Sequence, residues 1–152
     1  MSPNSTAGNA ETVLKIGGAA EKAVPDSRLI SLESEQDGDV WEAQVVTPDG
    51  VEHEMDLSAA DATVTSGPTK DEEDADDRAK HRRRLAEVSV DYRGAVKALG
   101  SAVPDGTITE LDLDSWKDKT VWEADVYDPA GTKHEVKVDA TTAEILANEA
   151  DG

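Results

Sequence analysis

Residues 122–145 read WEADVYDPAGTKHEVKVDATTAEI, and residues 41–64 read WEAQVVTPDGVEHEMDLSAADATV. The two stretches align without a gap and are identical at ten of 24 positions, including rare residue types that composition does not explain. These shared positions include Trp41 and Trp122, Pro48 and Pro129, Gly50 and Gly131, and His53 and His134. Their offset of 81 residues is too long for a solenoid repeat, so the pattern predicts two tandem units.

Each stretch has the pattern of a β-hairpin. Residues 41–45 and 122–126 alternate strictly, so each Trp shares a face with the Ala and Val that follow it. The returning strands, residues 51–57 and 134–138, alternate in the same way. The connecting tetrapeptides have Pro second and Gly fourth, which is typical of a type I turn. They are residues 47–50 and 128–131.

Upstream of each hairpin the sequence predicts a helix and a further strand. Apolar residues from Tyr92 to Val103 recur at helical spacing, Ser89 or Asp91 is suited to cap the start, and Pro104 ends the helix. A second stripe, from Val13 to Val24, stops at Pro25 in the same way. The expected strands are residues 29–33 and 108–113, each followed by a polar turn, at residues 35–39 and 114–119.

The expected fold is therefore α+β, with two tandem units that each pack one helix on a small antiparallel meander of three to four strands. Between them lies a segment with an acidic block before a basic block and almost no apolar residues, expected as a linker that is flexible or a transient helix. Whether the two units pack together stays open. The expected divisions are a disordered tether at residues 1–10, domains at 11–65 and 88–148, the linker at 66–87 and a tail at 149–152.

Charge and composition exclude several classes of function. The net charge is −19, and the acidic excess belongs to the units, with −10 over residues 1–65 and −8 over residues 88–152. Such a surface repels phosphate and anionic lipid, so we expect no nucleic-acid partner. No run of 18 apolar residues occurs, so we expect no membrane insertion. The absence of Cys excludes disulfides, thiolate metal sites and cysteine nucleophiles.

The end of the second stretch carries a family resemblance. Residues 138–145, VDATTAEI, follow the helix, the aromatic strand and the hairpin in an order that resembles the PepSY domain of bacterial peptidase propeptides. Ala143 stands where that pattern usually has Gly, and the first copy, residues 57–64, has lost the Asp. The resemblance covers residues 11–65 and 88–147. It implies a cystatin-like unit outside the cytoplasm that binds or restrains peptidases and has no catalytic residues.

The candidate sites are binding residues. Trp41 and Trp122 lie on an apolar strand face, where core packing is the first interpretation and ligand binding the alternative. Trp116 lies in a polar turn, where it either anchors an interface or folds back onto its own sheet. His53 and His134 recur at equivalent positions, but their acidic neighbours point to the opposite face, so we expect no metal and interpret them as residues of the sheet rim.

No catalytic motif or cofactor-binding loop occurs, so we expect no enzyme and no cofactor. The leading hypothesis is an exported, non-enzymatic binding protein whose partner is a peptidase or another cell-envelope protein. The alternative is an acidic structural or weakly cation-binding envelope protein, in which residues 71–77 attract Ca²⁺ weakly without the spacing of an EF-hand. Because residues 1–10 are no signal peptide, we expect a signal segment to have been removed; a cytoplasmic location is the alternative. The oligomeric state stays open.

Overall fold

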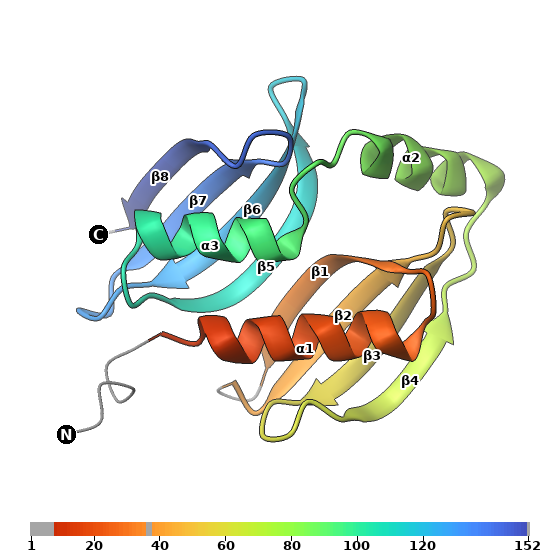
Figure 1. The fold of residues 1–152 in the computed structure, drawn as a ribbon, viewed down its shortest axis with the longest axis horizontal. Coiled ribbons are helices and arrows are strands. Elements are labelled where there is room, and N and C mark those ends of the chain that lie inside the picture. Colours follow the sequence, from red (N-terminus) through yellow and green to blue (C-terminus); the bar gives the residue numbers. More distant parts are fainter. Residues whose placement is uncertain (1–7, 36–37, 152) are drawn as a thin grey trace.

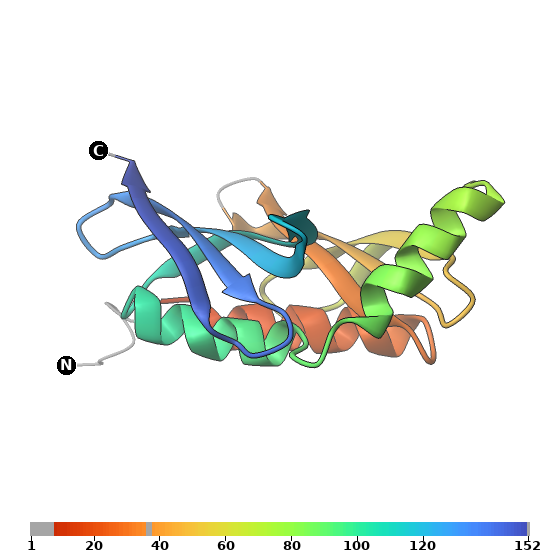
Figure 2. The ribbon, with the colours of Figure 1, turned by 90° about the horizontal axis from the view of Figure 1, so that it is seen from above.

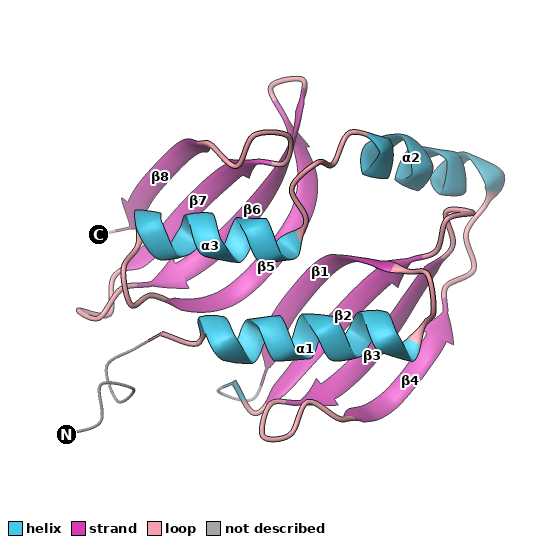
Figure 3. Cartoon of the chain, viewed as in Figure 1, coloured by secondary structure: helices cyan, strands magenta, loops and turns pink. Residues whose placement is uncertain are grey.

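The computed structural model describes residues 8–35 and 38–151, and its elements run as one helix, four strands, two helices and four strands (Figure 1, Figure 3). The helices are α1 (Ala10–Ala23), α2 (Ala75–Ala86) and α3 (Tyr92–Ala102). The strands are β1 (Arg28–Glu35), β2 (Val40–Val46), β3 (Glu52–Ser58), β4 (Val64–Lys70), β5 (Thr107–Trp116), β6 (Lys119–Tyr127), β7 (Lys133–Asp139) and β8 (Ile145–Asp151). The expected α+β class is confirmed.

All eight strands belong to one antiparallel sheet with the order β4-β3-β2-β1-β5-β6-β7-β8. Each meander follows chain order, and the two meanders join where β1 pairs with β5. The sequence does not predict that one meander extends the other, and it leaves open whether the two units pack together. In the structure the β1–β5 pairing joins them directly. The fourth strand of each meander is also longer than a short closing run, at seven residues.

Two helices cover the same face of the sheet. Figure 2 shows α1 and α3 side by side beneath the strands, with the other face uncovered. The buried stripe of α1 is Val13, Ile16 and Ala20, which the helical spacing predicts. The α3 stripe runs from Tyr92 to Leu99. One hydrophobic cluster of buried residues contains members of both helices and of six strands, β1–β3 and β5–β7, so the two halves of the chain share a core.

The join between the halves is made at three levels. In the sheet, Leu32 of β1 lies opposite Leu111 of β5, and neither has any exposed surface. Above them, the ring of Tyr92 in α3 packs against Gly17 of α1 so closely that a Cβ on Gly17 would lie 2.5 Å from the ring. At the start of α1, the Asn9 side chain bonds the backbone N–H and carbonyl of Ile108, each at 2.7 Å.

The two predicted type I turns are present. The Gly50 N–H donates to the Thr47 carbonyl at 2.8 Å, and the Gly131 N–H donates to the Asp128 carbonyl at the same distance. Both glycines have positive φ, 85° and 90°, a conformation that favours glycine over residues with a side chain. The Pro-x-Gly spacing therefore predicts the register of the β2–β3 and β6–β7 hairpins.

The polar turn expected at residues 114–119 is wrong in extent. β5 continues to Trp116, which pairs with Lys119 at the start of β6. Only Lys117 and Asp118 form the turn, both with positive φ, as a two-residue hairpin loop requires. Asp114 and Trp116 at this end of β5 are strand residues on the uncovered face, where composition alone does not distinguish them from a loop. In the corresponding turn of the first half, Gln36 and Asp37 lie outside the described residues.

The segment between the halves contains the end of β4 and the helix α2. Asp74 caps α2 by accepting the Asp77 N–H at 2.9 Å, and acidic residues at its start and basic residues at its end suit the helix dipole. No residue of α2 is buried. It lies beside the sheet at one end and is held by polar contacts, such as Arg82 Nη1 to the Asp49 carbonyl at 2.9 Å (Figure 1).

Candidate functional site

The two outer strands of the sheet differ in how well they could accept a further strand. β4 contains Pro68, which has no N–H to donate, and its pairing with β3 shifts register twice, so its outer edge is irregular. β8 has no Pro, and residues 147–151 pair in unbroken register with β7. Within the described chain no element covers β8 on its outer side (Figure 1). β8 is therefore the regular, open edge.

The outward donors of β8 follow from the ladder. Asp139 of β7 donates its N–H to the Glu144 carbonyl at 2.8 Å and accepts from the Ala143 N–H, so it faces β8. Because backbone groups alternate in direction along an antiparallel strand, residues opposite the alternate positions of β7 point outward. The register then places the N–H and carbonyl groups of Asn148 and Ala150 on the open edge.

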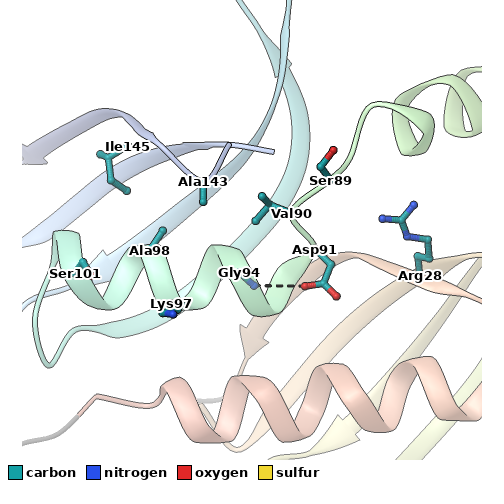
Figure 4. Close-up of a pocket in the computed structure, with 10 residues that line it drawn as sticks. All are labelled: Arg28, Ser89, Val90, Asp91, Gly94, Lys97, Ala98, Ser101, Ala143 and Ile145. Carbon is teal, nitrogen blue, oxygen red and sulfur yellow. Dashed lines mark hydrogen bonds between the residues drawn. The ribbon is translucent and has the colours of Figure 1, made fainter. Parts of the chain in front are cut away.

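A groove lies beside the start of β8 on the helix side of the sheet. Its volume is about 700 Å³, and its apolar part is formed by Val90, Ala98, Ala143 and Ile145. Figure 4 shows Ala98 on the side of α3 that is turned toward Ala143, with Ile145 of β8 beyond it. Arg28 of β1 lies at the opposite end of the groove.

One charged group in this groove has a structural role. Asp91 accepts the N–H groups of Arg93 and Gly94 and so caps α3, which settles the choice between Ser89 and Asp91. Its carboxylate is therefore engaged by the helix start (Figure 4). The groove combines an apolar base with Arg28 and Lys97, and it adjoins an unpaired strand edge. That combination suits an extended peptide whose alternate side chains enter a pocket.

Carboxylates crowd the uncovered face of the sheet. Burial, and then the nearby Glu54, raise the pKa of Glu42 to about 7. On β5, the hydrogen bond that the Glu110 carboxyl donates to Asp112, followed by burial, raises the pKa of Glu110 to about 7. Burial also raises the pKa of Asp112. Much of the acidic excess of the chain is therefore gathered on one face, opposite the helices.

Trp41 and Trp122 are core residues, each with 1% of its surface exposed. Trp122 donates its indole N–H to the Val90 carbonyl at 2.8 Å, which ties β6 to the segment before α3. The indole nitrogen of Trp41 is buried and has no hydrogen-bond partner among the described residues. The two equivalent Trp residues thus differ in whether the indole N–H has a hydrogen-bond partner. Neither ring lines the groove beside β8.

Trp116 lies at the end of β5 and is half-buried. It alternates with the core residue Leu113, so its ring is on the uncovered, acidic face. Lys117 Nζ lies 4.5 Å and Lys137 Nζ 5.7 Å from the ring centre. Two cations therefore accompany the ring, and Trp116 lies on β5, which β6 and β7 separate from the edge strand β8.

The two histidines of the repeat have different surroundings. His134 Nε2 is 2.8 Å from Asp128 Oδ2, and His134 Nδ1 is 3.0 Å from Asn148 Oδ1. The hydrogen bond to Asp128, and then that to Asn148, raise the pKa of His134. His53 lies opposite Val45 and its Nδ1 is buried without a hydrogen-bond partner in the described part of the chain. The structure does not bring the two histidines together.

The groove could not be predicted from the sequence, because its lining comes from β1, α3, the segment before α3, the β7–β8 connection and the start of β8. No spacing in the sequence marks these positions. A signal was present for β8, since ILANEAD has no Pro and only two charged residues. The contrast with VTSGPTK in β4 is readable before folding, because Pro is disfavoured in a strand that is to be extended.

Comparison with known proteins agrees with this fold. The crystal structure of a lipoprotein candidate from Clostridium difficile 630 is 19% identical, with a TM-score of 0.54 over 88% of this chain and 89% of that one. The YpeB C-terminal domain of Bacillus megaterium is 17% identical, with a TM-score of 0.34 over 94% and 65%. A BLIP-like protein of Bacteroides fragilis NCTC 9343 is 14% identical, with a TM-score of 0.33 over 91% and 87%. The TM-score of the first is that of a shared overall fold.

No curated protein matches the sequence. In the described residues, no helix has the length and apolarity needed to cross a bilayer. The family model described as "Peptidase propeptide and YPEB domain" matches residues 71–149, more than half of the chain, and this range includes α2, α3 and most of β5–β8. The chain therefore belongs to the PepSY family.

Proposed function

We propose that the protein is a non-enzymatic binding module that captures an extended segment of an exported peptidase, or of another envelope protein, on the open edge of β8. The observation that carries this proposal is the regular, proline-free edge of β8 beside a groove with an apolar base. Membership in a family named for peptidase propeptides favours a peptidase as the partner.

Binding by strand addition divides the work between backbone and side chains. The backbone groups of Asn148 and Ala150 supply hydrogen bonds that do not depend on the partner's sequence. Alternate side chains of the added strand lie on the helix side, where the groove beside Ile145 takes an apolar side chain. Those on the other side approach the acidic face, so basic residues are favoured there.

The same proposal includes two tandem PepSY-like, cystatin-like units, expected at residues 11–65 and 88–148 with a linker at 66–87, a tether at 1–10 and a tail at 149–152. Because α1 begins at Ala10, β4 ends at Lys70 and β8 ends at Asp151, we extend the two units to include these elements. Supporting observations are the ten identities in 24 aligned positions and the repeated order of one helix and four strands. We further propose an extracellular or envelope location, with a cytoplasmic location as the alternative. The first unit contributes strands β1–β4 of the shared sheet, and its Arg28 lines one end of the groove.

The test compares two substitutions at one exposed residue. Ala150→Pro removes an outward N–H without removing a donor to β7, whereas Ala150→Ser keeps every backbone group. Binding to an exported metallopeptidase of the same organism, and inhibition of that peptidase, are measured for both. We expect Ala150→Pro to weaken binding at least tenfold and Ala150→Ser to bind like the wild type. Equal binding by both variants, or no peptidase bound by the wild type, refutes the proposal.

A second candidate function has its own observation. The crowded carboxylates of the uncovered face, two of them with a pKa near 7, repel one another and are relieved by cations. An acidic structural or weakly Ca²⁺-binding envelope protein uses this face and needs no protein partner. Stoichiometric Ca²⁺ uptake that Glu42→Gln and Glu110→Gln reduce supports it, and Ca²⁺ uptake unchanged in both variants excludes it.

A further inference from the structure

Three side chains from separate parts of the chain meet beside α2. Glu52 comes from β3, Glu73 from the connection between β4 and α2, and His81 from α2 itself. One ligand atom from each lies within 4.8 Å of the others. His81 Nε2 is 3.0 Å from Glu73 Oε2 and 3.5 Å from Glu52 Oε1. The proposed binding function uses none of these residues.

The spacing of these atoms is that of metal ligands. Zn²⁺ binds imidazole nitrogen and carboxylate oxygen at about 2.0–2.2 Å, which places neighbouring ligands of a tetrahedron about 3.3 Å apart. The two measured separations, 3.0 and 3.5 Å, lie on either side of that value. The side chains are 14–17% exposed, so the atoms are shielded but not closed off. A small cavity of about 220 Å³ adjoins the group and is lined in part by Glu73 and Asp71.

The group also lacks a compensating cation. Glu73 Oε1 is buried and has no hydrogen-bond partner among the described residues, which is costly for a carboxylate. Arg78 lies close but donates to the Glu73 backbone carbonyl, and in the described chain no Lys or Arg forms an ion pair with the three side chains.

A further carboxylate, that of Asp71, lies next to the three side chains. Asp71 contacts the Glu52 carboxyl, and its backbone N–H donates to the Glu52 carbonyl at 2.9 Å. It is thus placed either to supply a fourth oxygen or to orient Glu52 from behind, as carboxylates around metal sites do. One imidazole with two or three carboxylates suits a borderline metal such as Zn²⁺, whereas Ca²⁺ takes six to eight oxygen ligands.

We propose that Glu52, Glu73 and His81 bind one divalent transition-metal ion, with Zn²⁺ as the fitting ion, and that the ion clamps α2 to the edge of the first meander. α2 buries no residue, so its attachment depends on polar contacts. Its backbone already approaches the β2–β3 turn closely, since a Cβ on Gly50 would clash with the Arg78 carbonyl oxygen. The bound ion fixes the helix that leads into α3.

The test is a titration of the full-length, tag-free chain with Zn²⁺ alone, followed by calorimetry. His81→Gln and Glu73→Gln each remove one ligand, and circular dichroism checks that they fold. The matched control is His134→Gln, because His134 also pairs with a carboxylate, Asp128, at 2.8 Å but forms no second carboxylate pair among the described residues. Hydrogen exchange of residues 75–86 is followed with and without Zn²⁺.

We expect one Zn²⁺ per wild-type chain, about a tenfold or greater loss of affinity in His81→Gln and Glu73→Gln, and no change in His134→Gln. Zn²⁺ slows exchange in α2 of the wild type and leaves it unchanged in His81→Gln, while millimolar Ca²⁺ does not displace Zn²⁺. Equal Zn²⁺ binding by wild type and His81→Gln, loss of binding in His134→Gln, or displacement by Ca²⁺ overturns the site. Zn²⁺ binding without slower exchange in α2 overturns the clamp.

Discussion

Adjacent glycines in α1 provide a sharp test of how the halves of the molecule pack. Gly17 and Gly18 both occupy the helix interior, where Ala is favoured over Gly by about 0.8–1.0 kcal/mol. A Cβ on Gly18 would lie 3.7 Å from the Tyr92 hydroxyl, an ordinary contact. A Cβ on Gly17 would lie 2.5 Å from Tyr92 Cε2 and 2.8 Å from Cζ, which is far too close. Gly17→Ala and Gly18→Ala therefore share the same gain in helix propensity, and only Gly17→Ala adds a steric clash with Tyr92.

The ring of Tyr92 has little freedom to move away. It is 1% exposed, and the Arg93 guanidinium lies 4.6 Å from its centre. Overpacking of this kind costs about 1–3 kcal/mol. We expect Gly18→Ala to raise the free energy of unfolding by about 1 kcal/mol. Gly17→Ala should fall below Gly18→Ala by about 1–3 kcal/mol, because the helix-propensity gain cancels in the difference.

Urea unfolding followed by Trp fluorescence measures both values. A second background, Tyr92→Leu, removes the ring atoms that the new methyl group would meet, so there Gly17→Ala should behave like Gly18→Ala. Equal shifts for the two alanine variants in the wild-type background would show that α1 and α3 do not pack as described. A difference that persists in Tyr92→Leu would assign the effect to the helix and not to the ring.

Three further predictions concern the uncovered face, a helix cap and the central join. The pKa values of Glu42 and Glu110 lie near 7 in the folded chain and lower in the unfolded chain, so the folded state binds more protons, and the melting temperature should fall as pH rises from about 5 to about 8. Glu42→Gln should make this fall smaller. A melting temperature that rises with pH contradicts the prediction. Asp91→Ala removes two hydrogen bonds at the start of α3 and should lower the free energy of unfolding by about 1 kcal/mol in urea, whereas Asp91→Asn should retain most of it. Leu32→Ala leaves a cavity under the β1–β5 ladder and should destabilise by about 2–5 kcal/mol in one cooperative transition, and two separate transitions would disprove a shared core.

Local patterns in the sequence predict most of each half. Alternation places Trp41 and Trp122 in the core, and the Pro-x-Gly turns set two hairpin registers. The helical spacing of apolar residues predicts α1 and α3, and Pro25 and Pro104 predict where these two helices end. These features depend on contacts between residues close in the chain, which is why one sequence is enough to find them.

The join and the groove depend on residues that are distant in the chain. Ser31 and Leu32 alternate in the same way whether β1 ends a sheet or continues into β5, so pairing with Asp112 and Leu111 leaves no mark in the pattern. His81 is similar, since its two carboxylate neighbours are 29 and eight positions away. Trp116 was placed in a turn because its neighbours are polar, whereas an acidic uncovered face makes polar residues normal in a strand.

The pairing of β1 with β5 also determines how many sheet edges of the molecule can accept a further strand. Two separate four-stranded sheets expose four edges, whereas the continuous sheet exposes two, and Pro68 with its register shifts makes one of them unsuitable. A chain with a single competent edge takes up one added strand and then has none left. If that strand is the β8 of a second copy, the contact is isologous and stops at a pair, because no further edge is free to propagate a fibre. Fusion of the halves thus limits how far edge-to-edge association can go.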